Sequence, residues 1–118
     1  MFITFNTEII SRIASGSIKN VQLFGDSLDR PAPPYAVVKP IAGGDRKLLQ
    51  IIVHMALGMP DILEAYLLRE LPELLKEPLE SGGRTITVMD TGAWYGPYTD
   101  EGDNTLAMSR DFYIPCIA

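Results

Sequence analysis

Cysteine and histidine are almost missing from this sequence of 118 residues, which has one of each, Cys116 and His54. A single cysteine cannot close an internal disulfide, which excludes a small secreted domain held together by disulfides. One imidazole and one thiol cannot fill the four-ligand shell of a zinc ion. A catalytic Cys–His pair would need the thiol of Cys116, near the C-terminal end, to be held in a fixed geometry against the imidazole of His54. We therefore interpret His54 as a structural residue of a sheet and expect no catalytic, metal or cofactor-binding residues.

Long apolar runs and an excess of basic residues are missing as well. The longest apolar stretch, residues 48–59, is interrupted by Gln50 and His54 and is much shorter than the ~20 residues of a membrane-spanning helix. The first twenty residues have no continuous apolar segment of the kind that signal peptides contain. A net charge of −5 argues against a general nucleic-acid surface. We expect no signal peptide, no contact with a membrane and no direct readout of nucleic acid.

The composition that is present is that of one globular domain. Hydrophobic residues make up 47% and charged residues 21%, and the length fits a single domain over residues 1–118. The charge is uneven, with more basic than acidic residues in 1–47 and the reverse in 48–118. Such a split favours head-to-tail contact between copies. The alternative is that both sets are ordinary solvated surface.

Two segments have the spacing of amphipathic helices. The first has Thr7 as a candidate N-cap and ends at the small residues 15–17. The second opens at Asp61 and extends to residue 75, and Pro72 either kinks it or begins a second short helix, because proline lacks an amide hydrogen. The apolar stripes consist of Ile9, Ile10, Ile13 and Ala14 in the first helix and Leu63, Leu67, Leu71 and Leu74 in the second.

Alternating and β-branched runs predict strands, and turn-forming residues predict loops. Pro40 either ends the first strong strand or confines it to a sheet edge. Residues 47–57 also fit helical spacing, but the β-branched run Ile51–Val53 favours a strand. The predicted strands are 35–39, 47–57, 84–89 and 105–114, with a weaker one at 18–24, a turn at 43–45, and loops at 25–34 and 90–104. Together these elements predict an α+β fold: a mainly antiparallel four- to five-stranded sheet with helices packed on one face.

Aromatic residues gather in the second predicted loop. Trp94, Tyr95 and Tyr98 make it a candidate contact surface, because such side chains bury a large area at low entropic cost. The alternative is that Trp94 folds back and caps the sheet. The basic pair Arg46 and Lys47 follows the predicted turn, and we include it among the interface candidates. The spacing around this pair is not that of a phosphate-binding loop, so a hairpin turn is favoured.

Carboxylates cluster at the end of the same predicted loop. Asp100, Glu101 and Asp103 lie around Gly102 and precede Asn104. Their spacing does not match an EF-hand, which favours a solvated acidic loop over a calcium site. The alternative function for the whole chain is nevertheless a small ligand- or ion-binding α+β domain, or an enzyme, that uses residues 100–104.

Residues 34–115 resemble the tail-terminator, or tail-completion, proteins in the neck of long-tailed bacteriophages and prophages. The likeness rests on a Pro-Tyr strand at 34–38, a following strand at 49–55, an acidic leucine helix at 61–75, and the ending at 106–115 with its Arg-x-Phe-x-x-Pro pattern.

The resemblance implies an α+β subunit that forms a ring, with a hexamer as the expected form. Such a ring caps the tail tube, stops its polymerisation and offers a surface to the head connector. The implied partners are further copies, the tail tube protein and the head connector protein, and the implied location is the host cytoplasm during assembly and then the virion. No catalytic residues come with this family. The uneven charge and the aromatic loop become candidate inter-subunit and tube-facing contacts, while the loop at 25–34 takes no role from it.

Overall fold

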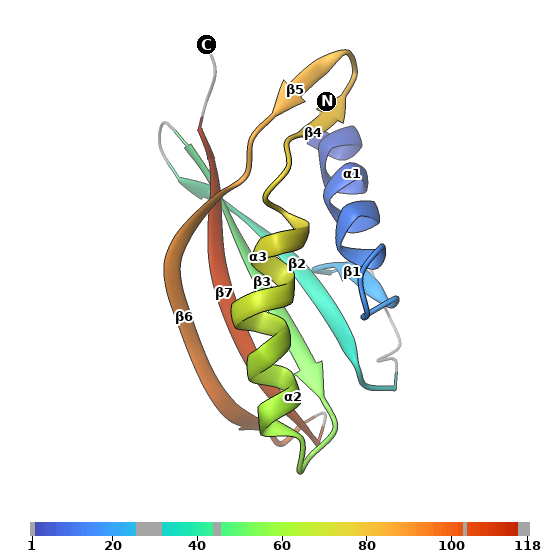
Figure 1. Ribbon diagram of the computed structural model, residues 1–118, viewed down its shortest axis with the longest axis vertical. Helices are drawn as coiled ribbons and strands as arrows, with labels where there is room; N and C mark the ends of the chain where they lie inside the picture. Colours follow the sequence, from blue (N-terminus) through green and yellow to red (C-terminus); the bar gives the residue numbers. More distant parts are fainter. Residues whose placement is uncertain (1, 26–31, 44–45, 103, 116–118) are drawn as a thin grey trace.

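The computed structural model describes residues 2–25, 32–43, 46–102 and 104–115. Two helical segments, a five-stranded sheet and a small two-stranded sheet account for most of them (Figure 1). In chain order the elements are α1 (Phe2–Ala14), β1 (Val21–Leu23), β2 (Tyr35–Gly43), β3 (Arg46–Met55), α2 (Pro60–Ala65), η1 (Tyr66–Glu70), α3 (Leu71–Leu74), β4 (Leu79–Ser81), β5 (Arg84–Ile86), β6 (Met89–Asp100) and β7 (Thr105–Pro115).

The five-stranded sheet has the order β1-β2-β3-β7-β6. Only the short β1 runs parallel to its neighbour, and the other three pairings are antiparallel. Both helical segments lie on the same face of this sheet (Figure 1). The predicted α+β fold, a mainly antiparallel sheet with helices on one face, is confirmed.

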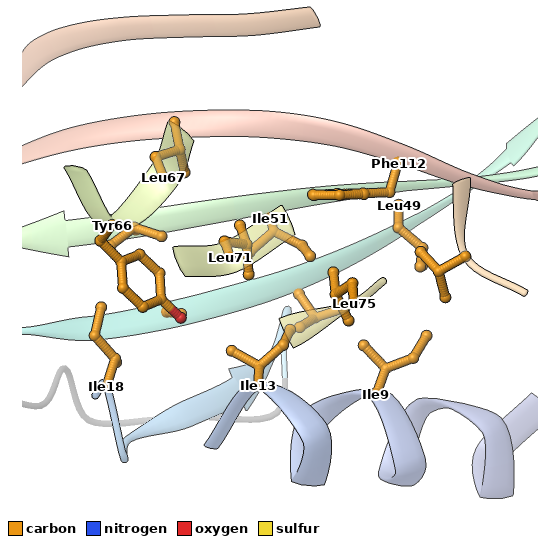
Figure 2. Close-up of a cluster of buried hydrophobic side chains, with 14 of the residues drawn as sticks. Ile9, Ile13, Ile18, Leu49, Ile51, Tyr66, Leu67, Leu71, Leu75 and Phe112 are labelled. Carbon is orange, nitrogen blue, oxygen red and sulfur yellow. The ribbon is translucent and has the colours of Figure 1, made fainter. Parts of the chain in front are cut away.

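The core fills the space between the sheet and the helices. Alternate residues of β2, β3 and β7 point toward the helices, as the two-residue period of a strand requires. Figure 2 shows Ile9 and Ile13 of α1 meeting the leucines of the second helical segment, with Phe112 and Leu49 behind them. The largest fully buried side chains are Phe112, Ile9, Ile13, Leu49, Ile51, Leu63, Leu67, Leu71, Leu75, Met108, Val38 and Val53. Each contributes about 1.5–3 kcal/mol of hydrophobic stabilisation.

The second helical segment is continuous from Pro60 to Leu74 but contains a π-helical turn, η1, in its middle. Pro72 is the second residue of α3, which directly follows η1; Glu70 and Leu71 at the junction have α-helical backbone angles. A short α-helix therefore does begin next to this proline, but it continues the preceding π-helical turn without a break. At its end, the guanidinium of Arg12 donates to the carbonyls of Leu74, Glu77 and Pro78 at 2.9–3.1 Å, which joins α1 to this segment.

Two predicted element ends differ from the structure. Thr7 lies within α1, which starts five residues earlier at Phe2, so its assignment as the N-cap is wrong. A threonine inside a helix costs about 0.5 kcal/mol of helix stability relative to alanine. This cost is too small to prevent α1 from continuing through Thr7. β2 runs through Pro40 to Gly43, but its pairing with β1 ends at Val38. Pro40 therefore does not end the strand but lies where β2 is an edge of the sheet, which was the second of the two predicted alternatives.

The chain between residues 76 and 104 departs most from the prediction. The expected strand at 84–89 is divided between β5 and the first residue of β6, and β5 forms a hairpin with β4, which was not predicted. The expected loop at 90–104 is wrong, because Met89–Asp100 is the longest strand of the sheet. As an edge strand, β6 accommodates its glycines and proline through two register shifts against β7. Of the predicted loop at 25–34, residues 26–31 lie outside the described part.

Candidate protein-interaction surface

The face of the sheet opposite the helices is not covered by any element within the described residues (Figure 1). Large apolar side chains nevertheless point from it into solvent. Ile41 is 40%, Tyr95 53% and Tyr98 47% exposed. The other partly exposed side chains of this face, here called the open face, are Val37, Lys39, Leu48, Gln50, Ile52, Asp111 and Tyr113. Exposed apolar and aromatic side chains lie on both sides of a polar row formed by Lys39, Gln50 and Asp111, and they make this face a candidate protein-interaction site.

A buried polar group fixes one end of the open face. The imidazole of His54 stacks on the ring of Tyr35, with centroids 4.5 Å apart and planes 8° from parallel. Its Nδ1 atom lies 2.9 Å from the Thr105 hydroxyl and 3.9 Å from a carboxylate oxygen of Asp100. His54 is only 8% exposed. These contacts connect His54 of β3 to residues of β2, β7 and β6, and the other candidate for a nucleophilic pair, Cys116, lies outside the described residues.

The three aromatic candidates all lie on β6, but they divide between the two faces of the sheet. Tyr95 is opposite Ser109 and Tyr98 is opposite Ala107, so both belong to the open face. Trp94 is opposite Arg110 and points to the side on which the helices lie. It is 44% exposed, so it does not fold back as a buried cap. β6 is the edge of the sheet, with one side of its backbone unpaired by any described strand.

The bulge that precedes Trp94 is held by a connected set of hydrogen bonds. The Asp90 carboxylate accepts from the Arg110 guanidinium at 2.7 and 3.0 Å and from the Gly92 amide at 2.8 Å. The Thr91 hydroxyl donates to the Asp111 carbonyl at 2.8 Å and accepts from the amide two residues further on. This local network fixes the backbone that presents the indole.

Burial changes the pKa of two groups on the open face. Desolvation raises the pKa of Asp111, and a hydrogen bond from the Tyr95 hydroxyl partly opposes this shift. Desolvation also raises the pKa of Tyr98, and the nearby charge of Asp100 raises it further. Tyr98 therefore remains a neutral phenol at physiological pH. Neutral phenols can be buried in an interface and still donate a hydrogen bond.

The basic candidates lie apart from the tyrosines. Lys47 is exposed near the start of β3, opposite Ile114, whereas Tyr95 aligns through Ser109 with Ile52, five residues further along β3. The side chain of Arg46 lies outside the described part of the structure. Lys47 is therefore not part of the same surface as Tyr95 and Tyr98.

The acidic residues form a tight turn between β6 and β7. Asp100 is the last residue of β6 and Asn104, with a φ of 56°, directly precedes β7. Asp103 lies outside the described residues. Within the described ranges, no three His, Cys, Asp or Glu side chains are grouped so that they could hold a metal ion. Over the same ranges, no helix is long and apolar enough to cross a membrane.

A groove on the helical side of the molecule was not predicted from the sequence. It has a volume of about 770 Å³ and lies between the second helical segment and the connection from α1 to β1. We call it the Tyr66 groove; its apolar lining includes Ile18, Met55, Ile62, Ala65 and Tyr66. The one signal in the sequence was Ile62, an apolar residue beside the leucine stripe, which is 55% exposed at the rim.

The wall of the Tyr66 groove contains a buried polar atom that pairs with no described residue. The Tyr66 hydroxyl has no hydrogen-bond partner within this part of the chain, and its desolvation strongly raises the pKa of the phenol. Beside it, the Glu70 carboxylate accepts from the amide and the hydroxyl of Ser17 at 2.6 and 2.7 Å. These bonds attach the connection after α1 to the π-helical turn and so hold two walls of the groove together.

Comparison with known proteins shows the fold and no more. No protein-family model and no curated protein sequence matches the chain. Four chains of solved structures match it. One of these, known only by a serial designation, superposes with a TM-score of 0.62 at 17% sequence identity, over 99% of this chain and 94% of that one. The whole chain therefore has the arrangement of a known, independently solved fold.

Proposed function

We propose that this protein is a structural assembly subunit that acts by packing against copies of itself and against other proteins. The observation that supports this most directly is the open face, on which Tyr95, Tyr98 and Ile41 are each 40% or more exposed. Leaving such side chains in water costs free energy that a partner recovers by covering them. The open face is part of a regular sheet, so little backbone ordering is needed on association.

The size of the open face suits a specific interface. Four strands about 4.8 Å apart and about 30 Å long give a flat area of roughly 600 Å² before side-chain relief is added. A standard interface buries roughly 800 Å² on each partner. One partner that covers the open face therefore forms a contact of ordinary size.

The two edges of the sheet carry opposite charges. Lys19 precedes β1 and Lys39 lies on β2, whereas Asp100 and Glu101 end β6 at the other edge. Opposite charges on opposite edges favour a head-to-tail contact, which repeats and closes into a ring where the rotation allows. This arrangement supports the head-to-tail contact expected from the uneven charge of the sequence.

Within this class, we propose a phage or prophage tail terminator, tail-completion or head-tail joining subunit that forms a ring at the end of the tail tube. The resemblance of residues 34–115 to that family supports the assignment, and the α+β fold is compatible with it. The test is to add the purified protein to polymerising tail tube protein of a long-tailed phage and to image the tubes by electron microscopy. We expect growth to stop with a ring at one tube end. Unchanged tube lengths without end-bound protein would contradict the assignment.

The broader proposal is tested on the open face itself. Ile52→Lys places a charge at the centre of this face, and Leu57→Lys places the same charge at an exposed position outside it; Leu57 is 46% exposed. We expect Ile52→Lys to reduce self-association or tube binding at least tenfold, while Leu57→Lys behaves as the wild type. Equal behaviour of the two variants would exclude the open face as the interface.

A further inference from the structure

We propose, on the basis of the assembly function above, that the Tyr66 groove of one copy receives Trp94 of the next copy. The contact is head to tail, because the indole is on β6 at one edge of the sheet and the groove is beside β2 near the other. This contact between Trp94 and the Tyr66 groove would join neighbouring copies through the helical side of the molecule. It is a second contact surface, distinct from the open face.

Trp94 is prepared for insertion. It is the one tryptophan of the chain, is 44% exposed, and projects from an edge strand. The hydrogen bonds of Asp90 and Thr91 already fix the bulge before it. A large aromatic side chain on a fixed backbone loses little conformational entropy when it is buried, which is typical of residues that dominate interfaces.

The indole cannot fill the groove of its own chain. β7 and β3 lie between β6 and β2, and three strand spacings of about 4.8 Å separate β6 from β2 by about 14 Å. Figure 1 shows β6 and the α1–β1 connection at opposite edges of the sheet. A second copy must therefore supply the indole.

The chemistry of the groove matches an indole. Its walls include Met55, Ile62 and the ring of Tyr66, which suit the apolar body of tryptophan. Indole has a single polar atom, an N–H that can only donate. Asp61 is exposed at the groove rim, and the described residues give its carboxylate no ion-pair partner, so it can accept this hydrogen. A bond from an N–H to a carboxylate is stronger than one between neutral groups.

The charges around the groove are mixed. Arg69 lines it and Lys19 follows its Ile18 wall, but Asp61, Glu70 and Glu73 line it as well. The proposed contact therefore rests on insertion of the indole between apolar walls and on its N–H, not on attraction between charged edges.

The first test compares single variants by sedimentation velocity. Trp94→Ala removes the inserted side chain, and Ile62→Asp removes an apolar wall and adds a charge. Leu57→Asp makes the same replacement at an exposed apolar residue that does not line the groove. We expect the first two to weaken self-association about 30-fold or more, as loss of an interface hot spot does, and Leu57→Asp to change it little.

The second test mixes the two defective variants. Trp94→Ala keeps an intact groove, and Ile62→Asp keeps an intact indole, so one productive contact per pair can form. We expect the mixture to associate more strongly than either variant does alone, because only the mixture can form the groove contact. Only the Ile62→Asp copy contains tryptophan, so its fluorescence should shift to shorter wavelength when the tryptophan-free partner is added.

The outcomes separate this inference from the assembly function. If Trp94→Ala and Ile62→Asp assemble as the wild type does, while Ile52→Lys does not, the groove contact is wrong and the assembly function stands. If the mixture associates no more strongly than the separate variants and the fluorescence does not shift, the groove contact is also wrong. If the wild type itself remains at 13.0 kDa at every concentration, both proposals fail together.

Discussion

Arg110 of β7 holds Asp90 of β6 in a two-point contact, with Nη2 and Nε 2.7 and 3.0 Å from the two carboxylate oxygens. The guanidinium side chain is 12% exposed and the carboxylate side chain 33%. Because Asp90 also accepts from the Gly92 amide, the same carboxylate fixes both the strand pairing and the bulge before Trp94. This contact connects the stability of the edge strand to the position of the exposed indole.

Asp90→Ala tests the contact between these two strands. We expect a loss of about 2 kcal/mol in the free energy of unfolding, because a charge-assisted contact is removed and Arg110 is left partly buried without its partner. Urea unfolding of Asp90→Ala, Arg110→Ala and the double variant measures this loss and the coupling. The double variant should lose clearly less than the two single losses combined, and simple additivity would show that the residues act independently.

Two glycines of β6 separate backbone strain from close packing. Both have positive φ, +81° at Gly92 and +106° at Gly96, but an added Cβ meets open space at Gly92 and would lie 2.9 Å from the Ala107 carbonyl oxygen at Gly96. Gly92→Ala should cost about 1 kcal/mol and Gly96→Ala about 1–3 kcal/mol more. Thermal unfolding of the two variants checks the order, and equal losses would contradict the packing argument.

The contact between the second helical segment and the sheet provides most of the core. Leu71→Ala at this contact should cost 2–5 kcal/mol, a large part of the roughly 5–15 kcal/mol that stabilises a typical domain. Leu57→Ala, at an exposed apolar residue, should change stability by less than about 0.5 kcal/mol. Chemical unfolding of the pair provides the comparison, and a small effect at Leu71 would contradict the described core.

The pKa of Asp111 predicts a specific pH dependence. Burial raises this pKa above its ordinary value of 3.8, so the folded protein retains the proton at a pH where the unfolded chain has lost it. The contribution of Asp111 to stability is therefore greatest below pH 3.8 and falls as pH rises through the folded pKa. Asp111→Asn should be more stable than the wild type at pH 7 and equally stable near pH 3. Melting temperatures at the two pH values test this, and an advantage confined to low pH would reverse the sign.

The sequence was sufficient for the elements whose hydrophobic period is regular. The β-branched run at Ile51–Val53 correctly indicated a strand, and the leucines from Leu63 to Leu74 correctly indicated a helix on the sheet. β6 was missed because Gly92, Gly96 and Pro97 are individually typical of turns. Only an edge position and two register shifts, which depend on the position of β7, make a strand possible there.

The candidate surface was predictable in part. Trp94, Tyr95 and Tyr98 were predicted to be a candidate contact surface, with a Trp94 that caps the sheet as the alternative. Their division between two faces follows from the pairing of β6 and could not be derived from a supposed loop. The Tyr66 groove joins residues from four separate segments, so no local pattern of residues indicates it. The roles of these residues in assembly remain predictions.

The solution mass of the purified wild-type protein tests the central proposal most directly. Light scattering coupled to size exclusion should give stable or concentration-dependent multiples of 13.0 kDa, because the open face and the opposite charges of the sheet edges both favour contact between copies. A mass of 13.0 kDa that does not change from micromolar to millimolar protein would contradict the account.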